Sequence, residues 1–127
     1  MIFGVGTDVV EIGRIEKALA RWGERFAERI LCAPELNRFR KHKQPASYLA
    51  KRFAAKEAFT KALGTGIKAP ANWHGVWVTN RPSGKPELEF SKPLQTLLSG
   101  RGISRAHLSL ADERGVAVAT VILECEK

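Results

Sequence analysis

Cysteine is scarce in this sequence of 127 residues. Only Cys32 and Cys125 are present, they lie far apart along the chain, and neither has the spacing of a metal-binding motif. This excludes a structural zinc site, and two free thiols are typical of a reducing compartment. We therefore expect a cytoplasmic protein.

Targeting signals and long hydrophobic runs are absent as well. The N-terminal stretch MIFGVGTD has neither a cationic lead-in nor a small-residue cleavage site, and no apolar run approaches the length of a membrane span. The sequence also lacks internal repeats, low-complexity tracts and linkers. It predicts one soluble domain over residues 1–127, large enough to bury a core without disulfides, and no membrane partner.

Acidic residues are in the minority, since 13 Asp and Glu stand against 21 Lys and Arg and give a formal net charge of +8. Such an excess indicates an anionic partner, which could be nucleic acid, an acidic protein or a phosphate-rich ligand. Charge alone does not choose among these three.

The stretch PASYLAKRFAAKEAFTKALGTG lacks β-branched runs and is rich in Ala, Leu, Phe and Lys, which predicts a helix over residues 46–63. Pro45 suits the first turn of a helix, and Gly64 suits its C-terminal end. Apolar residues fall on nearly every side of this helix. A helix of this kind is usually central, with other elements packed around it.

Two charged residues interrupt the apolar surface of this helix. Glu57 and Lys61 lie one turn apart and in line with Phe53. An exposed Glu–Lys pair at this spacing stabilises a helix by only about 0.2–0.5 kcal/mol. Alternatively, Glu57 is partly buried, which is costly unless the carboxylate is paired or bound to a metal. Helix statistics favour the exposed pair, whereas the rest of the chain favours the metal site.

The N-terminal segment predicts a strand over residues 1–6, followed by a helix over residues 9–21. Asp8 and Glu11 have the spacing of a capping box, so the Asp8 carboxylate would accept backbone N–H bonds at the start of that helix. Metal binding by Asp8 remains equally open, and one carboxylate can do both.

A cationic stripe follows at spacings of three or four residues, which would place it on one side of a helix that continues towards Gly23. Like charges one turn apart repel, so such a stripe is more easily tolerated where an anionic partner binds. A solvated cationic face is the alternative. The stripe consists of Arg14, Lys17, Arg21 and Arg25, with Arg29 beyond.

The remaining segments predict short helices and antiparallel strands. Period-two alternation in the last hairpin places His107 and Ser109 on one face and Leu108 and Leu110 on the other. The expected helices cover residues 26–31, 34–42 and 92–100, the last capped by Ser91, and the expected strands cover residues 73–79, 87–90, 105–111 and 116–124.

Three stretches, in this order and at this spacing, resemble the holo-acyl-carrier-protein synthase family of 4′-phosphopantetheinyl transferases, of the small single-domain type. They are GVGTDVVEI, KRFAAKEAFTKALGTGI and HLSLADERGVAVATVILE. The family's K-E-A-x-x-K core stands here as Lys56, Glu57, Ala58 and Lys61. The chain departs from the commoner pattern at Asp112 and Glu113, where a His-Thr-like pair is more usual. The resemblance implies an α+β fold in which a long central helix is wrapped by a small, mostly antiparallel sheet, with short flanking helices.

The resemblance also implies an activity, namely transfer of the phosphopantetheine arm of coenzyme A to a serine of acyl carrier protein, in support of fatty acid biosynthesis. The other product is adenosine 3′,5′-bisphosphate, and Mg²⁺ is required. Asp8 and Glu57 would bind the metal, and the coenzyme A phosphates would be held by Lys61, His107 and Ser109, with Lys43 and Arg52 at the 3′-phosphate. The basic residues Arg14, Arg21, Arg25 and Arg29 would dock the acidic helix of the carrier protein.

Phosphoryl transfer of this kind needs positioning and charge neutralisation rather than a protein nucleophile, and Mg²⁺ prefers one or two carboxylates together with water and substrate phosphates. Either Glu57 or a water molecule of the metal site would take the serine proton, while Lys61 and His107 stabilise the leaving group. The competing hypothesis is a small basic RNA- or protein-binding module without catalysis. It predicts exposed aromatic residues among the basic ones, so we expect no nucleic-acid partner.

The family assembles as a trimer with sites between neighbouring subunits, and the aromatic segment WHGVWVT fits such an interface. Alternation over residues 73–79 places Trp73 and Trp77 on one side and Val76 and Val78 on the other, so both sides of the strand need cover. We expect a homotrimer in which His107 reaches the site of a neighbouring subunit.

Overall fold

A computed structural model describes residues 1–126 of the chain. Within this range the chain forms five strands and five helices. In chain order they are β1 (Ile2–Glu11), α1 (Ile12–Trp22), α2 (Glu24–Ile30), α3 (Ala33–Lys41), α4 (Pro45–Leu63), β2 (Val76–Asn80), β3 (Pro86–Phe90), α5 (Lys92–Gly100), β4 (Ile103–Glu113) and β5 (Val116–Cys125).

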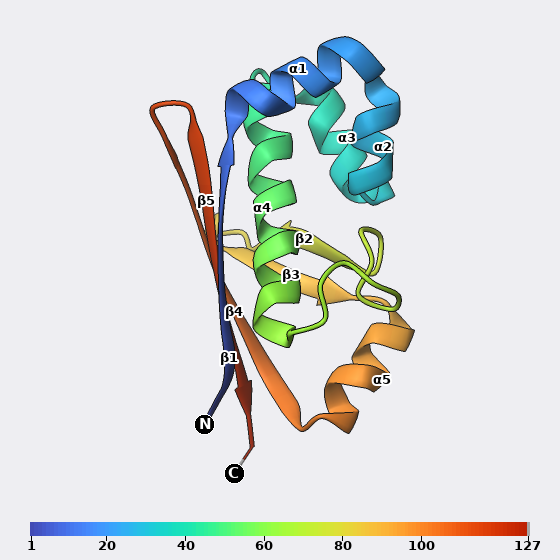
Figure 1. The fold of residues 1–127 in the computed structure, drawn as a ribbon, viewed down its shortest axis with the longest axis vertical. Coiled ribbons are helices and arrows are strands. Elements are labelled where there is room, and N and C mark those ends of the chain that lie inside the picture. Colours follow the sequence, from blue (N-terminus) through green and yellow to red (C-terminus); the bar gives the residue numbers. More distant parts are fainter. Residues whose placement is uncertain (127) are drawn as a thin grey trace.

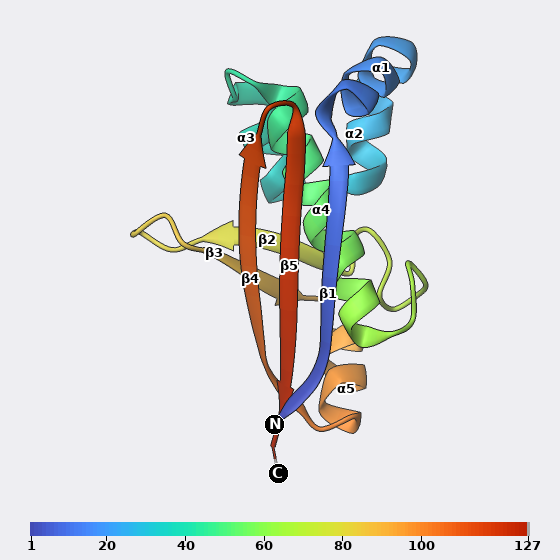
Figure 2. The same ribbon diagram turned by 60° about the vertical axis from the view of Figure 1, so that its left-hand side comes forward.

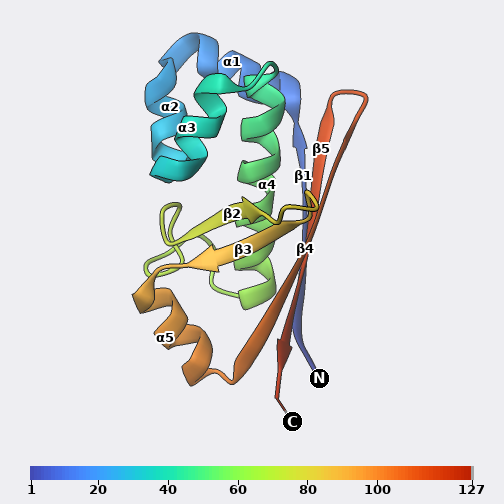
Figure 3. The same ribbon diagram turned by 180° about the vertical axis from the view of Figure 1, so that it is seen from behind.

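Three long strands form an antiparallel sheet in the order β1–β5–β4, and α4 packs along one face of it (Figure 1). The strands β2 and β3 form a separate hairpin that crosses behind the long strands and extends beyond β4 (Figure 2). This hairpin lies across the middle of α4 (Figure 3). The helices α1, α2 and α3 gather around the N-terminal part of α4, and α5 lies at the other end. The arrangement is the expected α+β fold with a long central helix.

The central helix agrees with its prediction. It begins at Pro45, one residue earlier than expected, and ends at Leu63, where Gly64 adopts the left-handed conformation with φ 89°. Most of its side chains are buried because the sheet, the hairpin and three helices surround it. Neither this helix nor any other within residues 1–126 is long and apolar enough to cross a membrane.

Two glycines of β1 allow the strand to lie directly against α4. A Cβ atom added at Gly4 would come within 2.0 Å of the carbonyl oxygen of Ala62, and one at Gly6 within 1.9 Å of that of Ala58. Only glycine permits this backbone approach. The close packing fixes β1, including the residues that follow Gly6, against the second half of the helix.

The predicted helix over residues 9–21 is wrong at its start, because β1 continues to Glu11. Asp8 is paired with Ala119 and Val10 with Ala117 in the ladder between β1 and β5. Asp8 therefore does not cap a helix, and Glu11, the residue before α1, makes no side-chain cap either. The β-branched pair Val9–Val10 favours a strand, and the ladder with β5 outweighs the local capping-box pattern.

The aromatic strand also begins later than expected, at Val76 instead of Trp73. The ring of Trp73 packs against that of Phe53, with centroids 4.9 Å apart, inside the same chain. A Cβ atom at Gly75 would meet the carbonyl oxygen of Pro70 at 2.2 Å, so this segment packs closely against the preceding loop. The alternation expected over residues 73–79 therefore holds only from Val76 onward.

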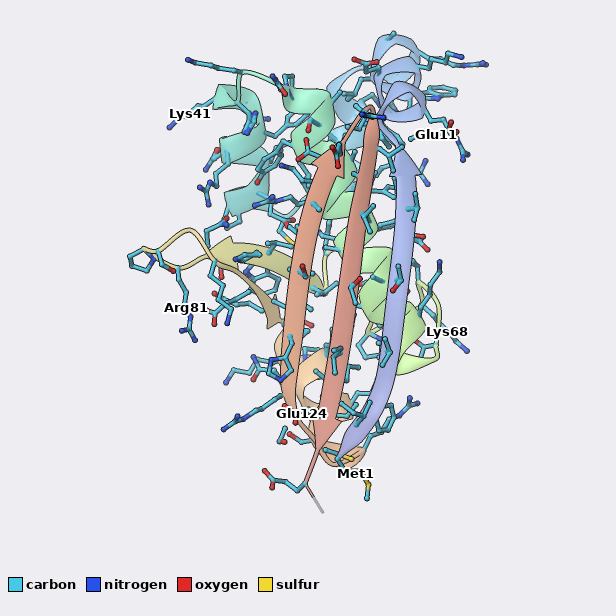
Figure 4. The ribbon with its side chains drawn as sticks, turned by 90° about the vertical axis from the view of Figure 1, so that its left-hand side faces the viewer. Met1, Glu11, Lys41, Lys68, Arg81 and Glu124 are labelled. Carbon is cyan, nitrogen blue, oxygen red and sulfur yellow. The ribbon has the colours of Figure 1, made fainter. Side chains whose placement is uncertain are left out.

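The outer face of the three-stranded sheet carries exposed apolar side chains among polar ones, and no helix within residues 1–126 covers it (Figure 4). In the register of the ladders, Val5, Ile122 and His107 form one row across the sheet, and Val9 and Val118 belong to another. Val5 is 57 % and Val9 61 % exposed. As predicted, His107 and Ser109 are on the exposed side of β4, and Leu108 and Leu110 are turned towards the core.

Candidate active site

Asp8, Glu57 and Lys61 come together at the edge of β1, and we call them the carboxylate half-site. The ammonium group of Lys61 donates hydrogen bonds to Asp8 Oδ1 at 3.0 Å and to the carbonyl oxygen of Thr7 at 3.1 Å. The Asp8 side chain is 15 % exposed and that of Lys61 is 52 % exposed. The half-site is thus open to solvent on the lysine side.

The simple helix-surface pair between Glu57 and Lys61 does not form, because Lys61 binds Asp8 instead. Within residues 1–126, the Glu57 carboxylate forms neither a salt bridge nor a hydrogen bond. Burial raises the pKa of Glu57, the negative charge of Asp8 raises it further, and Lys61 offsets part of this rise. Glu57 is therefore a carboxylate that has no direct ion-pair partner among the described residues.

The chemistry of these groups fits Mg²⁺. Two carboxylates sit close enough to repel, only one ammonium group balances them, and all the available donor atoms are oxygens. Within the described residues, no group of three or more His, Cys, Asp or Glu side chains could hold a metal. Magnesium does not need one, since it commonly takes one or two carboxylates and completes its shell with water and substrate phosphates.

His107 and Ser109 lie on the other side of the molecule, on β4. They line an open hollow of about 550 Å³ between β4 and the β2–β3 loop. Nε2 of His107 donates a hydrogen bond of 2.5 Å to Glu124, and this bond lowers the pKa of the Glu124 carboxyl. We call the hollow's basic side chains the cationic half-site: Arg81, Lys85, Arg105 and His107.

Sequence reasoning missed the three other cations of the cationic half-site. Arg81 and Lys85 flank the turn of the β2–β3 hairpin, and Arg105 is two residues before His107. The two cations on either side of the Pro-Ser-Gly turn were the sequence signal that could have revealed part of this cluster. Arg81 and Lys85 lie near β4 because of the way the hairpin packs, and the sequence does not reveal this packing.

The two half-sites lie apart within one chain. Asp8 lies on the same face of the sheet as α4, whereas His107 lies on the outer face. They also belong to the two edge strands, β1 and β4, which are separated by β5, a distance of about 10 Å. In Figure 4, Lys68 marks the β1 side and Arg81 the β4 side.

Arg52 and Lys43, both predicted to bind the 3′-phosphate, do not lie close to each other either. Arg52 is five residues before Glu57 on α4, which places it about 140° around the helix, and it donates a hydrogen bond to Asn80 at the end of β2. Lys43 lies in the link before α4, where it lines a separate hollow with Asp112. Arg52 thus belongs to the hairpin side of the molecule, and Lys43 to the turn between β4 and β5.

The cationic stripe lies on two helices instead of one. Gly23, with φ 66°, separates α1 from α2, so Arg14, Lys17 and Arg21 are on α1 and Arg25 and Arg29 are on α2. Trp22, which sequence reasoning overlooked, is 58 % exposed at this junction. It lines an apolar hollow of about 360 Å³ with Phe26, Arg25 and Arg29.

Comparison with known proteins decides the family. Residues 4–121 match the model of the 4′-phosphopantetheinyl transferase superfamily. The chain belongs to this superfamily.

Relatives in the superfamily match along nearly the whole chain. A holo-[acyl-carrier-protein] synthase of Nitrosospira multiformis is 51 % identical over 98 % of this chain and 99 % of its own length. The crystal structure of the synthase from Neisseria meningitidis has a TM-score of 0.94 at 44 % identity, and covers 98 % of this chain and 99 % of that one. A Bacillus anthracis synthase in complex with CoA (3′,5′-ADP) has a TM-score of 0.83 at 38 % identity, with 99 % of both chains covered. These similarities confirm the resemblance and the predicted fold.

Proposed function

We propose that this chain transfers the 4′-phosphopantetheine group of coenzyme A to a serine of acyl carrier protein, and so serves fatty acid biosynthesis. The curated relatives are holo-[acyl-carrier-protein] synthases over almost the full length of the chain, and the Bacillus anthracis structure holds the coenzyme A nucleotide. The observation that carries the proposal is the carboxylate half-site, in which Lys61 pairs with Asp8 and leaves the neighbouring Glu57 carboxylate without a direct ion-pair partner among the described residues.

Asp8 and Glu57 are the residues that would hold Mg²⁺. When bound, the ion would neutralise charge on the coenzyme A pyrophosphate. The serine oxygen of the carrier protein attacks the β-phosphate, its bond to phosphorus forms as the bond to the adenosine bisphosphate breaks, and adenosine 3′,5′-bisphosphate leaves. The raised pKa of Glu57 suits a group that accepts the serine proton.

The remaining charges serve the leaving group. Lys61 stands one turn from Glu57 with its ammonium group half exposed, so it can follow the charge that builds on the departing phosphate. His107 and Ser109 would contact the coenzyme A phosphates from the cationic half-site, and Arg52 would bind the 3′-phosphate. Lys43 has the weakest support for this role because it lines a different hollow.

A complete site would form between two chains. Each chain would contribute its carboxylate half-site to one neighbour and its cationic half-site to the other, which a closed ring of three identical subunits allows. The exposed side chains of Val5 and Val9 on the outer face of the β1–β5–β4 sheet support this assembly, since exposed apolar groups that lie close together mark protein interfaces. The outer face of this sheet, instead of the aromatic segment WHGVWVT, would then form the subunit interface, because Trp73 packs inside its own chain.

Arg14, Arg21, Arg25 and Arg29 would form the surface that docks the acidic carrier protein. The hollow beside Trp22 and Phe26 offers an apolar contact among these charges. A cytoplasmic location completes the proposal, because Cys32 and Cys125 are free thiols far apart in sequence.

The direct test is mass spectrometry of apo acyl carrier protein incubated with this chain, coenzyme A and Mg²⁺. We expect the carrier protein to gain one phosphopantetheine group and adenosine 3′,5′-bisphosphate to accumulate in equal amount. Carrier protein that stays unmodified, while a known synthase modifies the same preparation, would refute the proposal.

A further inference from the structure

Two arginine side chains converge on a single neutral oxygen near the β2–β3 hairpin. Nη1 of Arg38 on α3 donates to Asn80 Oδ1 at 3.0 Å, and Nη2 of Arg52 on α4 donates to the same oxygen at 3.1 Å. Within the described residues, neither arginine forms a salt bridge. Two positive charges therefore share an uncharged acceptor.

The buried part of this cluster has unused hydrogen-bonding groups. Arg52 is only 5 % exposed and Tyr48, whose ring lies under its guanidinium group, 3 % exposed. Among residues 1–126, the Nε of Arg52 and the hydroxyl group of Tyr48 both lack a hydrogen-bond partner. Buried polar groups are seldom left in this state, because each loses its hydrogen bonds to water without gaining a partner in the protein.

The electrostatics of the cluster also favour an added negative charge. Burial lowers the pKa of Arg52, Tyr48 and Glu35 offset part of this effect, and the positive charge of Arg38 lowers the pKa further. The Nδ2 group of Asn80 donates to the carbonyl oxygen of Gly84 at 3.0 Å, which holds the amide oxygen towards the two arginines. The cluster is thus fixed in place by the hairpin and lacks only an anion.

We propose that Arg38 joins Arg52 in binding the terminal 3′-phosphate of coenzyme A, and that this arginine pair selects a dianionic phosphate monoester. This inference rests on the function proposed above and adds Arg38 as a residue that determines donor specificity. Asn80 is followed directly by Arg81, which lines the hollow of the cationic half-site. One peptide bond thus links the acceptor of the arginine pair to the wall of that hollow, and a nucleotide bound there would direct its 3′-phosphate towards the pair.

The charge balance explains why a monoester is preferred. A phosphate monoester carries close to two negative charges at neutral pH, because its second pKa is about 6, whereas a phosphodiester carries one. Two guanidinium groups match the dianion, and each can donate two parallel hydrogen bonds to its oxygens. Arg38 is exposed and stands outside the core, so its removal should leave the fold intact.

The test compares coenzyme A with 3′-dephospho-coenzyme A as donors for the Arg38→Gln variant. We expect kcat/KM for coenzyme A to fall about 10- to 100-fold, the range for a lost charge-assisted hydrogen bond, while kcat/KM for the dephospho donor stays unchanged. Arg40→Gln is the matched control, since Arg40 lies on the same helix and pairs with Glu24 away from the cluster. An equal loss with both donors, or no loss with either, would overturn the inference.

A binding measurement separates this inference from the proposed reaction. Calorimetry should show that Arg38→Gln loses affinity for adenosine 3′,5′-bisphosphate but not for adenosine 5′-monophosphate. This result would support the arginine pair even if no transfer to a carrier protein occurred. Equal affinities of the variant and the unmodified protein for the bisphosphate would contradict it.

Discussion

Lys56 and Glu57 are neighbours on α4, yet they occupy opposite kinds of environment. Lys56 is fully buried and its ammonium group donates to Glu35 at 2.8 Å and to the carbonyl oxygens of Ile30 and Trp73. Glu57 is partly exposed, and its pKa is raised by burial and by the negative charge of Asp8, with Lys61 offsetting part of the rise. One charge is completely satisfied inside the chain, and the other is available for a ligand.

The surroundings of Glu35 complete the contrast. Its two carboxylate oxygens also accept the backbone N–H groups of Cys32 and Val78, at 3.0 and 2.9 Å. This buried pair therefore joins α2, α3, α4 and β2, which holds the helix in a fixed rotation about its axis. The buried Lys56–Glu35 pair thus positions Glu57. Lys56 itself is not available to contact a substrate.

The largest effect is expected from Glu57→Gln. The amide is a poor ligand for Mg²⁺ and cannot accept the serine proton, so transfer should fall by at least about 1,000-fold, within the range for a lost catalytic acid or base. The fold should remain, as judged by circular dichroism. Transfer is measured by mass spectrometry of the carrier protein, with the exposed Glu89→Gln as the control. Near-normal turnover of Glu57→Gln would remove Glu57 from the reaction.

Lys56→Met should produce the opposite result, with stability as the main loss. It leaves Glu35 as an uncompensated buried charge, which costs about 3–5 kcal/mol of unfolding free energy. Adding Glu35→Leu should restore only part of this stability, because it removes the buried charge but leaves the backbone N–H groups of Cys32 and Val78 without their acceptor. Urea unfolding of the single and double variants measures both effects. If Lys56→Met unfolds like the unmodified protein, the buried pair does not hold the helix.

The exposed arginines of α1 resemble Glu57, since neither Arg14 nor Arg21 forms a salt bridge within residues 1–126, and Arg21 contacts the ring of Trp22. Arg14→Glu with Arg21→Glu should raise KM for the carrier protein by about tenfold and leave KM for coenzyme A unchanged, because surface charges act mainly on association. High salt should mimic the change. Lys92→Glu with Arg101→Glu, at the ends of α5, is the control. Equal effects on both substrates would assign the α1 arginines to the nucleotide site.

The smallest effect concerns the pH dependence of stability. The pKa of Glu57 is higher in the folded chain than in the unfolded one, so its ionisation disfavours folding above that pKa, and this cost disappears as the pH falls. Without metal, Glu57→Gln should therefore have a higher Tm than the unmodified protein at about pH 7 and lose this advantage at about pH 4. Thermal melts at both values measure the difference. A difference in Tm that is the same at both pH values would show that the surroundings of the Glu57 carboxyl do not raise its pKa.

Local sequence predicted the elements whose signals do not depend on distant partners. The central helix has its composition, Pro45 and Gly64 in agreement, and the last hairpin has clear alternation. The start of α1 failed because Asp8 and Glu11 look like a cap locally, whereas the ladder with β5 extends β1 past them. That ladder joins segments more than 100 residues apart, so no local pattern reveals it.

The motifs predicted the candidate residues, and the resemblance predicted that His107 serves the site of a neighbouring subunit, but the geometry that separates His107 from Asp8 could not be read from the sequence. Helix geometry alone places Arg52 and Glu57 on different sides of α4. The positions of His107 and Asp8 on opposite faces of the sheet require the strand order β1–β5–β4, which the sequence does not specify. The meeting of Arg38, Arg52 and Asn80 likewise depends on three elements packing together.

The most direct test of the account mixes two inactive variants, Asp8→Ala and His107→Ala, by co-expression, with trimer mass confirmed in solution. If the carboxylate half-site of one chain meets the cationic half-site of the next, every mixed trimer contains one intact site out of three. Mixed trimers should then recover about a third of the activity of the unmodified protein. Mixed trimers that stay as inactive as either variant alone would show that each site is built within a single chain.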